Sequence, residues 1–172
     1  LMVYTEGPKS KHRVGAGASI KSHGQPDSRS RAILRLEDSV VTADVYAIKT
    51  AGQKLLEDIT SGKSITVLSD SKHALNKLNA VRVGNANVRS CIEAWKELST
   101  TNKVKFRWVK AHSTSEGNKQ ADELAKEGAK STLPMEKTMT LVKEIARAVK
   151  METTIEWTTD WRRNPGYCRQ PK

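Results

Sequence analysis

In this 172-residue chain, the segment Ser64-Ile65-Thr66-Val67-Leu68-Ser69, followed directly by Asp70, is the most informative about fold class. Its nearly continuous apolar run is typical of a buried strand in a parallel sheet. An acidic residue directly after such a strand lies at the carboxyl edge, where α/β sheets bind their ligands. The stretch therefore predicts an α/β protein with a candidate site at Asp70.

The residues before this stretch predict three strands and one long helix. Residues 2–6 and 15–21 have strand composition, and residues 31–36 alternate apolar and charged side chains. Turn residues separate the three segments, which favours an antiparallel meander. Apolar residues then recur at helical spacing over residues 41–59, so we expect a helix there.

Capping and turn residues, together with the apolar patterns further along the chain, complete the expected order of elements. Thr42 is the expected N-cap of the long helix, and Gly62 is the expected stop signal after it. The elements expected downstream are a short helix after Ser71, a helix with Val88, Ile92, Trp95 and Leu98 on one face, a strand at residues 104–109 and a helix at residues 118–130.

This order predicts a five-stranded mixed sheet, in which an antiparallel three-strand meander is joined by two parallel strands and flanked by helices. Pro134 marks a boundary, so we expect one domain over residues 1–130 and a C-terminal extension over residues 131–172. An apolar stripe at helical spacing predicts an amphipathic helix early in the extension, whereas its polar end is expected to be disordered. Trp157 and Trp161 are expected to pack against the domain rather than to stack on bases.

Composition indicates a polyanionic partner. The chain has 30 Lys and Arg against 19 Asp and Glu, a net charge of +11, which favours nucleic acid; a merely soluble basic surface is the alternative.

Two cysteines, Cys91 and Cys168, argue against a disulfide framework, and Cys91 is expected in the core. Without a long apolar run or a signal peptide, we expect an intracellular protein, cytoplasmic or nuclear, without membrane contact. Because the chain starts within an expected strand, we expect it to be part of a longer polypeptide.

Four acidic residues are placed where a metal site could use them. Glu6 ends the first strand, Asp70 follows the buried strand, and Asp122 lies in the last helix. Asp44 lies on the apolar stripe of the long helix, where a carboxylate is costly without a partner. Taken singly, Glu6 could be a turn acid, Asp70 a helix cap and Asp122 a residue that complements the helix dipole.

Together, the four carboxylates predict a cation site. Hard divalent cations prefer oxygen ligands, and Mg²⁺ is the best match, with Mn²⁺ as a second possibility. Two such ions roughly 3.5–4 Å apart can stabilise the attacking and leaving oxygens of a phosphodiester.

Four ordered segments resemble type 1 ribonuclease H. These are residues 3–20 (VYTEGPKSKHRVGAGASI), 42–48 (TADVYAI), 67–75 (VLSDSKHAL) and 108–129 (WVKAHSTSEGNKQADELAKEGA). The C-terminal pattern is similar to the stretch that follows this domain in polyproteins of non-LTR (LINE-type) retrotransposons. The resemblance implies a ribonuclease H-like fold, hydrolysis of the RNA strand of RNA–DNA hybrids, and reverse transcriptase domains as neighbours in one polyprotein.

The resemblance also implies roles for single residues. Glu6, Asp44, Asp70 and Asp122 would be the metal ligands, and His112, ten residues before Asp122, would assist proton transfer or product release. The residues expected to bind substrate are Ser71, Asn118, Lys9 and Lys72, with Lys11, Arg13 and Lys77 along the backbone path or, equally, on a solvated face.

This chain departs from the family's pattern at two acids. The first acid is usually Asp and is Glu6 here, whereas the second is usually Glu and is Asp44 here. Each exchange moves a carboxylate by one methylene, and a ~1 Å misplacement can cost ~10²-fold in rate. Thr114 replaces a glycine of the His loop, and Pro8 replaces a serine of the first turn. We expect retained but reduced activity; a silent nucleic-acid-binding module and a polyprotein connector are the alternatives.

Overall fold

The structure is a computed structural model, and it describes residues 1–7, 13–35, 38–58, 60–80, 85–110 and 116–131. The elements in chain order are β1 (Met2–Glu6), β2 (Val14–Lys21), β3 (Ser28–Leu34), α1 (Val40–Glu57), β4 (Ser64–Ser69), α2 (Lys72–Leu78), α3 (Ala86–Thr101), β5 (Lys103–Trp108) and α4 (Glu116–Lys130). Within these residues, a helix with the length and apolarity needed to cross a membrane is absent.

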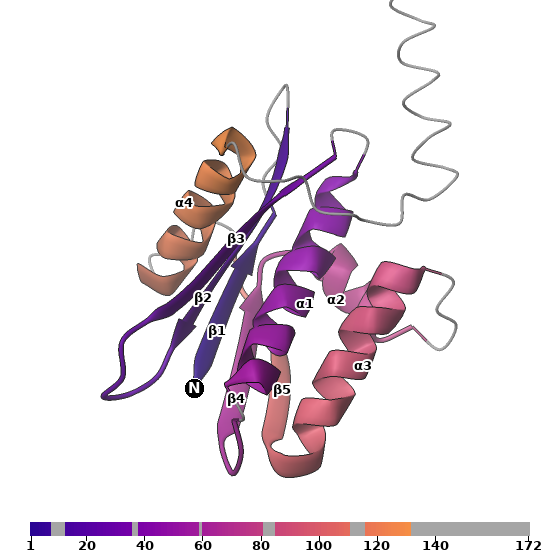
Figure 1. Cartoon of the computed structure of the whole chain (residues 1–172). Helices are drawn as coiled ribbons and strands as arrows, with labels where there is room; N and C mark the ends of the chain where they lie inside the picture. The colour runs from indigo at the N-terminus through magenta and orange to yellow at the C-terminus, as the bar shows by residue number, and fades with distance from the viewer. Residues whose placement is uncertain (8–12, 36–37, 59, 81–84, 111–115, 132–172) are drawn as a thin grey trace, which may run out of the picture. The chain divides into compact units, whose positions relative to one another are not determined.

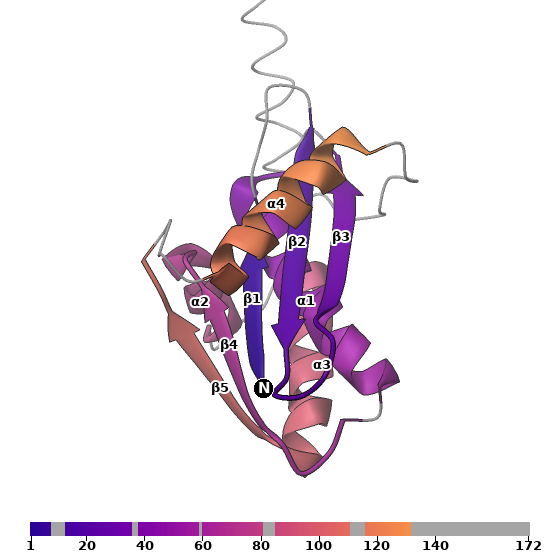
Figure 2. The same cartoon turned by 90° about the vertical axis from the view of Figure 1, so that its left-hand side faces the viewer.

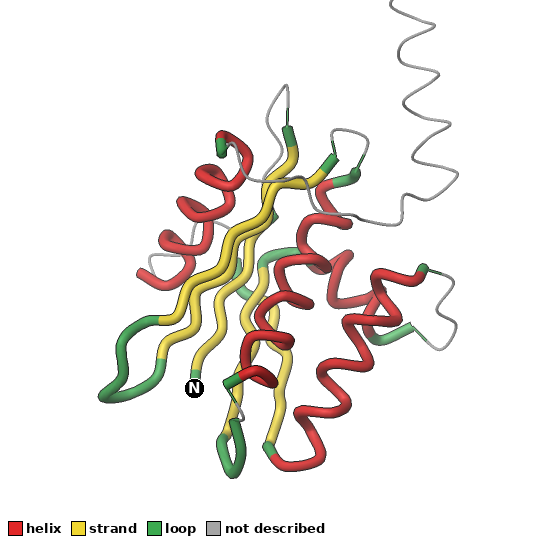
Figure 3. The backbone as a smooth tube through the Cα atoms, viewed as in Figure 1, coloured by secondary structure: helices red, strands yellow, loops and turns green. Residues whose placement is uncertain are grey.

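The five strands form one mixed sheet in the order β3-β2-β1-β4-β5 (Figures 1 and 3). β1 pairs antiparallel with β2, and β2 pairs antiparallel with β3. β4 joins β1 in parallel, and β5 joins β4 in parallel. The fold class expected from the sequence, a three-strand meander extended by two parallel strands, is therefore confirmed.

The main core lies between one face of the sheet and the helices α1 and α3. β4 contributes Ile65 and Val67, both fully buried, and α1 contributes Ile48. Trp95 of α3 is buried here and donates a 3.0 Å hydrogen bond from Nε1 to the backbone oxygen of Ile48. Cys91 lies in the same cluster, and burial raises its pKa to about 12, so it is a core residue as expected.

The opposite face of the sheet carries α4, which crosses β2 and β3 and also contacts β1 (Figure 2). Both surfaces of this contact consist of small residues: β2 reads VGAGAS from Val14, and the buried face of α4 is built from Gly and Ala with Asn118. Small side chains let the helix backbone approach the sheet closely. The amino end of α4 is thereby held beside the carboxyl end of β1.

Three local expectations about element ends were wrong. Ser39, not Thr42, caps α1, because the Ser39 hydroxyl accepts the Thr42 amide at 3.1 Å. The helix ends at Glu57 with Asp58 as its C-cap, so Gly62 serves the turn before β4, with a φ of +65°, instead of stopping the helix. β3 begins at Ser28 rather than at residue 31, because pairing with β2 continues to Ile20 and overrides the local turn signals.

Candidate active site

Two of the predicted acids are brought together by strand pairing. β1 and β4 run parallel, and their last paired residues are Thr5 and Ser69. Glu6 and Asp70 each follow that pair by one residue, so they lie side by side at the carboxyl edge of the sheet. Their carboxyl groups are hydrogen-bonded to each other and repel each other when both are charged.

Asp44 reaches the same edge from α1. Asp44 is only 4% exposed, although it carries a carboxylate. The Ser71 hydroxyl and the backbone N–H of Gly7 both donate hydrogen bonds to this carboxylate. These two donors offset part of the cost of burying the charge. We call Glu6, Asp44 and Asp70 the acidic cluster.

Two members of the acidic cluster, Glu6 and Asp44, have raised pKa values. Burial raises the pKa of Glu6 to about 8, repulsion from Asp70 and Asp44 adds to the rise, and a hydrogen bond from Asn118 opposes it. Burial also raises the pKa of Asp44 to about 7, against the hydrogen bonds from Ser71 and Gly7. Carboxyl groups with pKa values near neutrality that repel one another are stabilised as anions by a nearby cation.

Asn118 joins the acidic cluster from α4. It is 3% exposed, and its side-chain amide donates to Glu6. The residue before it is Gly117, where a Cβ would collide with the ring of Tyr4 on β1. Glycine at this position therefore lets the first turn of α4 lie against β1 and brings Asn118 to the end of that strand.

Asp122 lies one turn beyond Asn118 on α4 and is half-buried. Its carboxylate accepts a hydrogen bond from Lys126 at 2.5 Å, and this contact raises the pKa of the lysine. Glu6 adds to the rise, so Lys126 lies within electrostatic range of both acids. Asp122 is thus near the acidic cluster, but its described partner is a lysine rather than another carboxylate.

Ser71 and Lys72 hold the segment after β4. The Ser71 hydroxyl accepts the Ala74 amide at 3.2 Å as the N-cap of α2, and the same hydroxyl donates to Asp44. Lys72 is exposed, and its ammonium lies 4.2 Å from the centroid of the Trp108 ring. The Trp108 indole Nε1 donates to the backbone oxygen of Asp70 at 2.9 Å. The end of β5 is therefore hydrogen-bonded directly to the backbone of Asp70, a member of the acidic cluster.

The donor chemistry suits a hard divalent cation, because carboxylate oxygens dominate the site. Asn118 adds a buried Oδ1 that has no hydrogen-bond partner among the described residues. Among the residues that the structure describes, however, no group of three or more His, Cys, Asp or Glu side chains is arranged to hold a metal ion. The residues fit such an ion by charge and donor type, and Glu6, Asp44 and Asp70 with Asp122 are the ones that would hold it.

Several predicted residues lie outside the part of the chain that the structure describes. They are His112, Lys9, Lys11, Pro8, Thr114 and the tryptophans Trp157 and Trp161. Their expected roles remain predictions.

The sequence interpretation missed two positions. At Gly7, a Cβ would lie 2.5 Å from the Asp44 backbone nitrogen and 2.7 Å from its Oδ1. Trp108, expected within a strand and at the start of the segment 108–129, is 46% exposed and donates a hydrogen bond to the Asp70 backbone oxygen. The available signals were a glycine directly after an acid and a tryptophan on an edge strand, and neither identifies its contact without the fold.

Comparisons with known proteins agree with this architecture. The chain is 28% identical over 138 residues to the ribonuclease H of Francisella philomiragia, an alignment that covers 73% of this chain and 88% of that protein. The crystal structure of RNase H1 from Halobacterium salinarum has the same fold, with a TM-score of 0.57, 17% identity, and coverage of 74% of this chain and 95% of that one. The N-terminal RNase H domain of a Mycobacterium tuberculosis protein, solved as a fusion with maltose-binding protein, gives a TM-score of 0.58 at 15% identity, over 74% and 97% of the two chains.

A sequence model of the RNase H family matches residues 1–130. This match covers every strand and helix described above and includes the acidic cluster. The chain belongs to the RNase H family.

Proposed function

We propose that this protein is a metal-dependent endonuclease that hydrolyses the RNA strand of RNA–DNA hybrids. The observation that supports this most strongly is the convergence of Glu6, Asp44 and Asp70 from three elements, with the pKa raised to about 8 at Glu6 and about 7 at Asp44. Membership of the RNase H family supports the same reaction and substrate.

The chain's own residues would divide the work as follows. Glu6, Asp44, Asp70 and Asp122 would hold two Mg²⁺ or Mn²⁺ ions, and these ions would supply positive charge beside the phosphodiester. Asn118 and Ser71 orient Glu6 and Asp44 through their hydrogen bonds. His112 transfers protons near neutral pH or assists product release, and Lys9 and Lys72 contact the substrate backbone.

The test is cleavage of an end-labelled RNA–DNA hybrid in the presence of Mg²⁺ or Mn²⁺. We expect internal cuts in the RNA strand only, and no cuts with the Asp70→Asn variant, which keeps the shape of the side chain but not its charge. Equal cleavage by wild type and variant would mean that the acidic cluster is not the site of the reaction.

The Glu6 and Asp44 exchange is testable in the same assay. We propose that the longer arm at Glu6 and the shorter arm at Asp44 compensate for each other, so Glu6→Asp and Asp44→Glu should each lower the rate. The double variant should recover it. A rise in rate with either single variant contradicts compensation.

A catalytically weakened or silent nucleic-acid-binding module is the second candidate. One observation favours it: the Asp122 carboxylate is paired with Lys126 rather than with another member of the site. Such a module would shift a labelled hybrid in a gel without cutting it, whereas a connector domain would not bind it.

We also propose that residues 1–130 form the nuclease domain and residues 131–172 an extension, within a retrotransposon polyprotein that contains a reverse transcriptase. The similarity of the C-terminal pattern to such polyproteins supports this context. Sequencing of the full transcript tests it, because a reverse transcriptase reading frame should lie upstream in the same frame.

A further inference from the structure

The edge strand β5 carries a row of cations on one face. Side chains alternate between the two faces of a strand, so Lys103, Lys105 and Arg107 point to the same side. Phe106 points to the other side, where its ring lies 5.3 Å from that of Trp95 on α3. We call Lys103, Lys105 and Arg107 the basic row; all three are exposed and face away from α3.

The described part of the chain leaves the basic row uncovered. α4 packs on the other end of this sheet face, over β2, β3 and β1, and Figure 2 shows β4 and β5 beside it without a described helix in front of them. The paired residues of β4 on this face are Ser64, Thr66 and Leu68, all uncharged. Among the described side chains, none of the ion pairs involves a member of the row.

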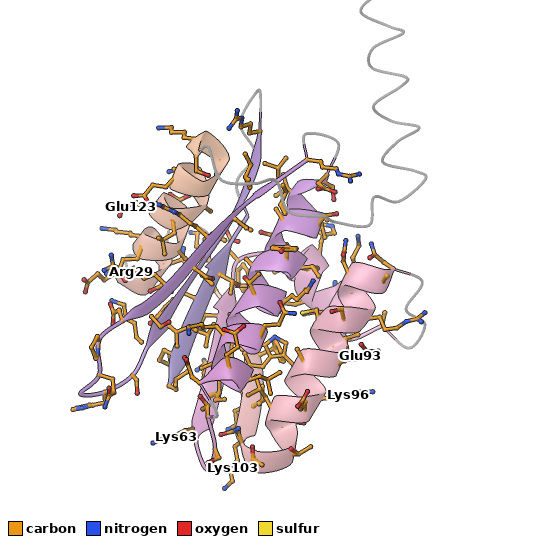
Figure 4. The ribbon with its side chains drawn as sticks, in the orientation of Figure 1. Arg29, Lys63, Glu93, Lys96, Lys103 and Glu123 are labelled. Atoms are coloured by element: carbon orange, nitrogen blue, oxygen red, sulfur yellow. The ribbon has the colours of Figure 1, made fainter. Side chains whose placement is uncertain are left out.

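The basic row begins next to the acidic cluster. β5 runs parallel to β4, and Arg107 pairs with Leu68, two residues before Asp70. From Arg107 the row continues along β5 to Lys103, which Figure 4 labels beside Lys63 at the far end of the strand. At about 3.3 Å per residue, this path is about 13 Å long. A chain of negative charges that leaves the acidic cluster in this direction meets three successive cations.

We propose that the basic row binds the phosphate backbone of the nucleic-acid substrate outside the segment that is cut. The inference rests on the proposed function for its substrate, and it adds a second contact surface on β5. A polyanion of regular charge spacing complements a row of unpaired cations at regular spacing, and a chain of net charge +11 attracts it over long range. Because the row begins next to the acidic cluster and extends about 13 Å from it, a substrate must continue beyond the cut to contact all three cations.

The experiment compares two triple variants in the Asp70→Asn background, which we expect to bind the hybrid without cutting it. One variant is Lys103→Gln, Lys105→Gln and Arg107→Gln, and the matched control is Arg29→Gln, Lys96→Gln and Lys130→Gln. The control removes the same charge from exposed positions on β3, α3 and α4, two of which are labelled in Figure 4. Binding to an RNA–DNA hybrid of about 20 base pairs is followed by fluorescence anisotropy over a range of salt concentrations.

We expect the row variant to bind about tenfold more weakly than the control, with a plot of log K against log salt that is less steep by about 2 to 3 units. Equal affinities and slopes of the two triples overturn the proposal. Cleavage by the wild type is measured separately, so loss of the proposed function and loss of this surface are distinguishable.

Discussion

Asn118 is the residue through which α4 acts on the acidic cluster. Its amide donates to Glu6 and lowers the pKa of that carboxyl, while its own Oδ1 is buried without a hydrogen-bond partner among the described residues. A buried polar atom without a partner is costly in a structural role alone. The unpartnered Oδ1 of Asn118 is consistent with an oxygen that contacts a bound ligand.

Replacing Asn118 tests this link. In Asn118→Ala, Glu6 loses the hydrogen bond that favours its charged form, so its pKa should rise further. The acid limb of the pH–rate profile for hybrid cleavage should then move to higher pH, and metal affinity should fall about 10- to 100-fold, as for other lost outer-shell contacts. As a control, Gln120→Ala removes an amide on the same helix that contacts Ser19 rather than the acidic cluster. An unchanged profile for Asn118→Ala contradicts the link.

At Gly7, the backbone that follows β1 lies close to the backbone of α1. In Gly7→Ala, the new Cβ would lie 2.5 Å from the Asp44 nitrogen, so one of the two segments must move. We expect a loss of about 1–3 kcal/mol in the free energy of unfolding and a fall in kcat of about 10²-fold.

The matched control is Gly24→Ala. Gly24 has a φ of +73° in an open turn, so alanine there costs stability without touching the site. Chemical denaturation and cleavage rates of both variants are compared. A normal kcat for Gly7→Ala would show that Asp44 tolerates the displacement.

At the scale of elements, β4 and β5 hold the loop that carries Asp70. The indole of Trp108 is bonded to the Asp70 backbone oxygen, and the Lys72 ammonium lies over the same ring. In Trp108→Phe the aromatic face remains but the N–H donor is lost. We expect a fall in kcat of several-fold with a small change in KM, because the affected group is an acid of the site. The melting temperature serves as the control for folding, and an effect on KM alone would assign Trp108 to substrate binding instead.

The local sequence predicted some elements of the fold correctly and others not. Periodicity predicted that Asp44 lies on the buried face of α1, because helical spacing alone places it with Ile48. The start of β3 was not predictable, since its first residues become a strand only through pairing with β2. Contacts such as Gly7 with Asp44 and Trp108 with Asp70 depend on distances between elements, which no local pattern contains.

At the scale of the whole molecule, the raised pKa values link stability to pH. Glu6 and Asp44 bind protons more tightly in the folded than in the unfolded state, so the folded protein holds more protons between their ordinary and raised pKa values. Their contribution to stability is therefore complete below about pH 4 and is lost as the pH rises towards 7 and 8. Metal-free protein should lose stability over this range, and Mg²⁺ should restore it at high pH.

Denaturation in urea at several pH values, with EDTA or with Mg²⁺, measures this linkage. Since other groups titrate in the same range, the informative quantity is the difference between the wild type and Glu6→Gln, which cannot titrate. We expect the loss between pH 5 and pH 8 to be smaller in Glu6→Gln. Identical pH dependence of the two proteins would contradict the coupling.

If Glu6, Asp44 and Asp70 form one divalent-cation site, metal binding must displace protons from their carboxyl groups. Calorimetric titration with Mn²⁺ at about pH 6.5, in buffers of different ionisation enthalpy, counts the protons that leave. We expect saturable binding that releases protons in the wild type and is lost in Asp70→Asn. Binding without proton release, or binding that is unchanged in Asp70→Asn, would contradict it.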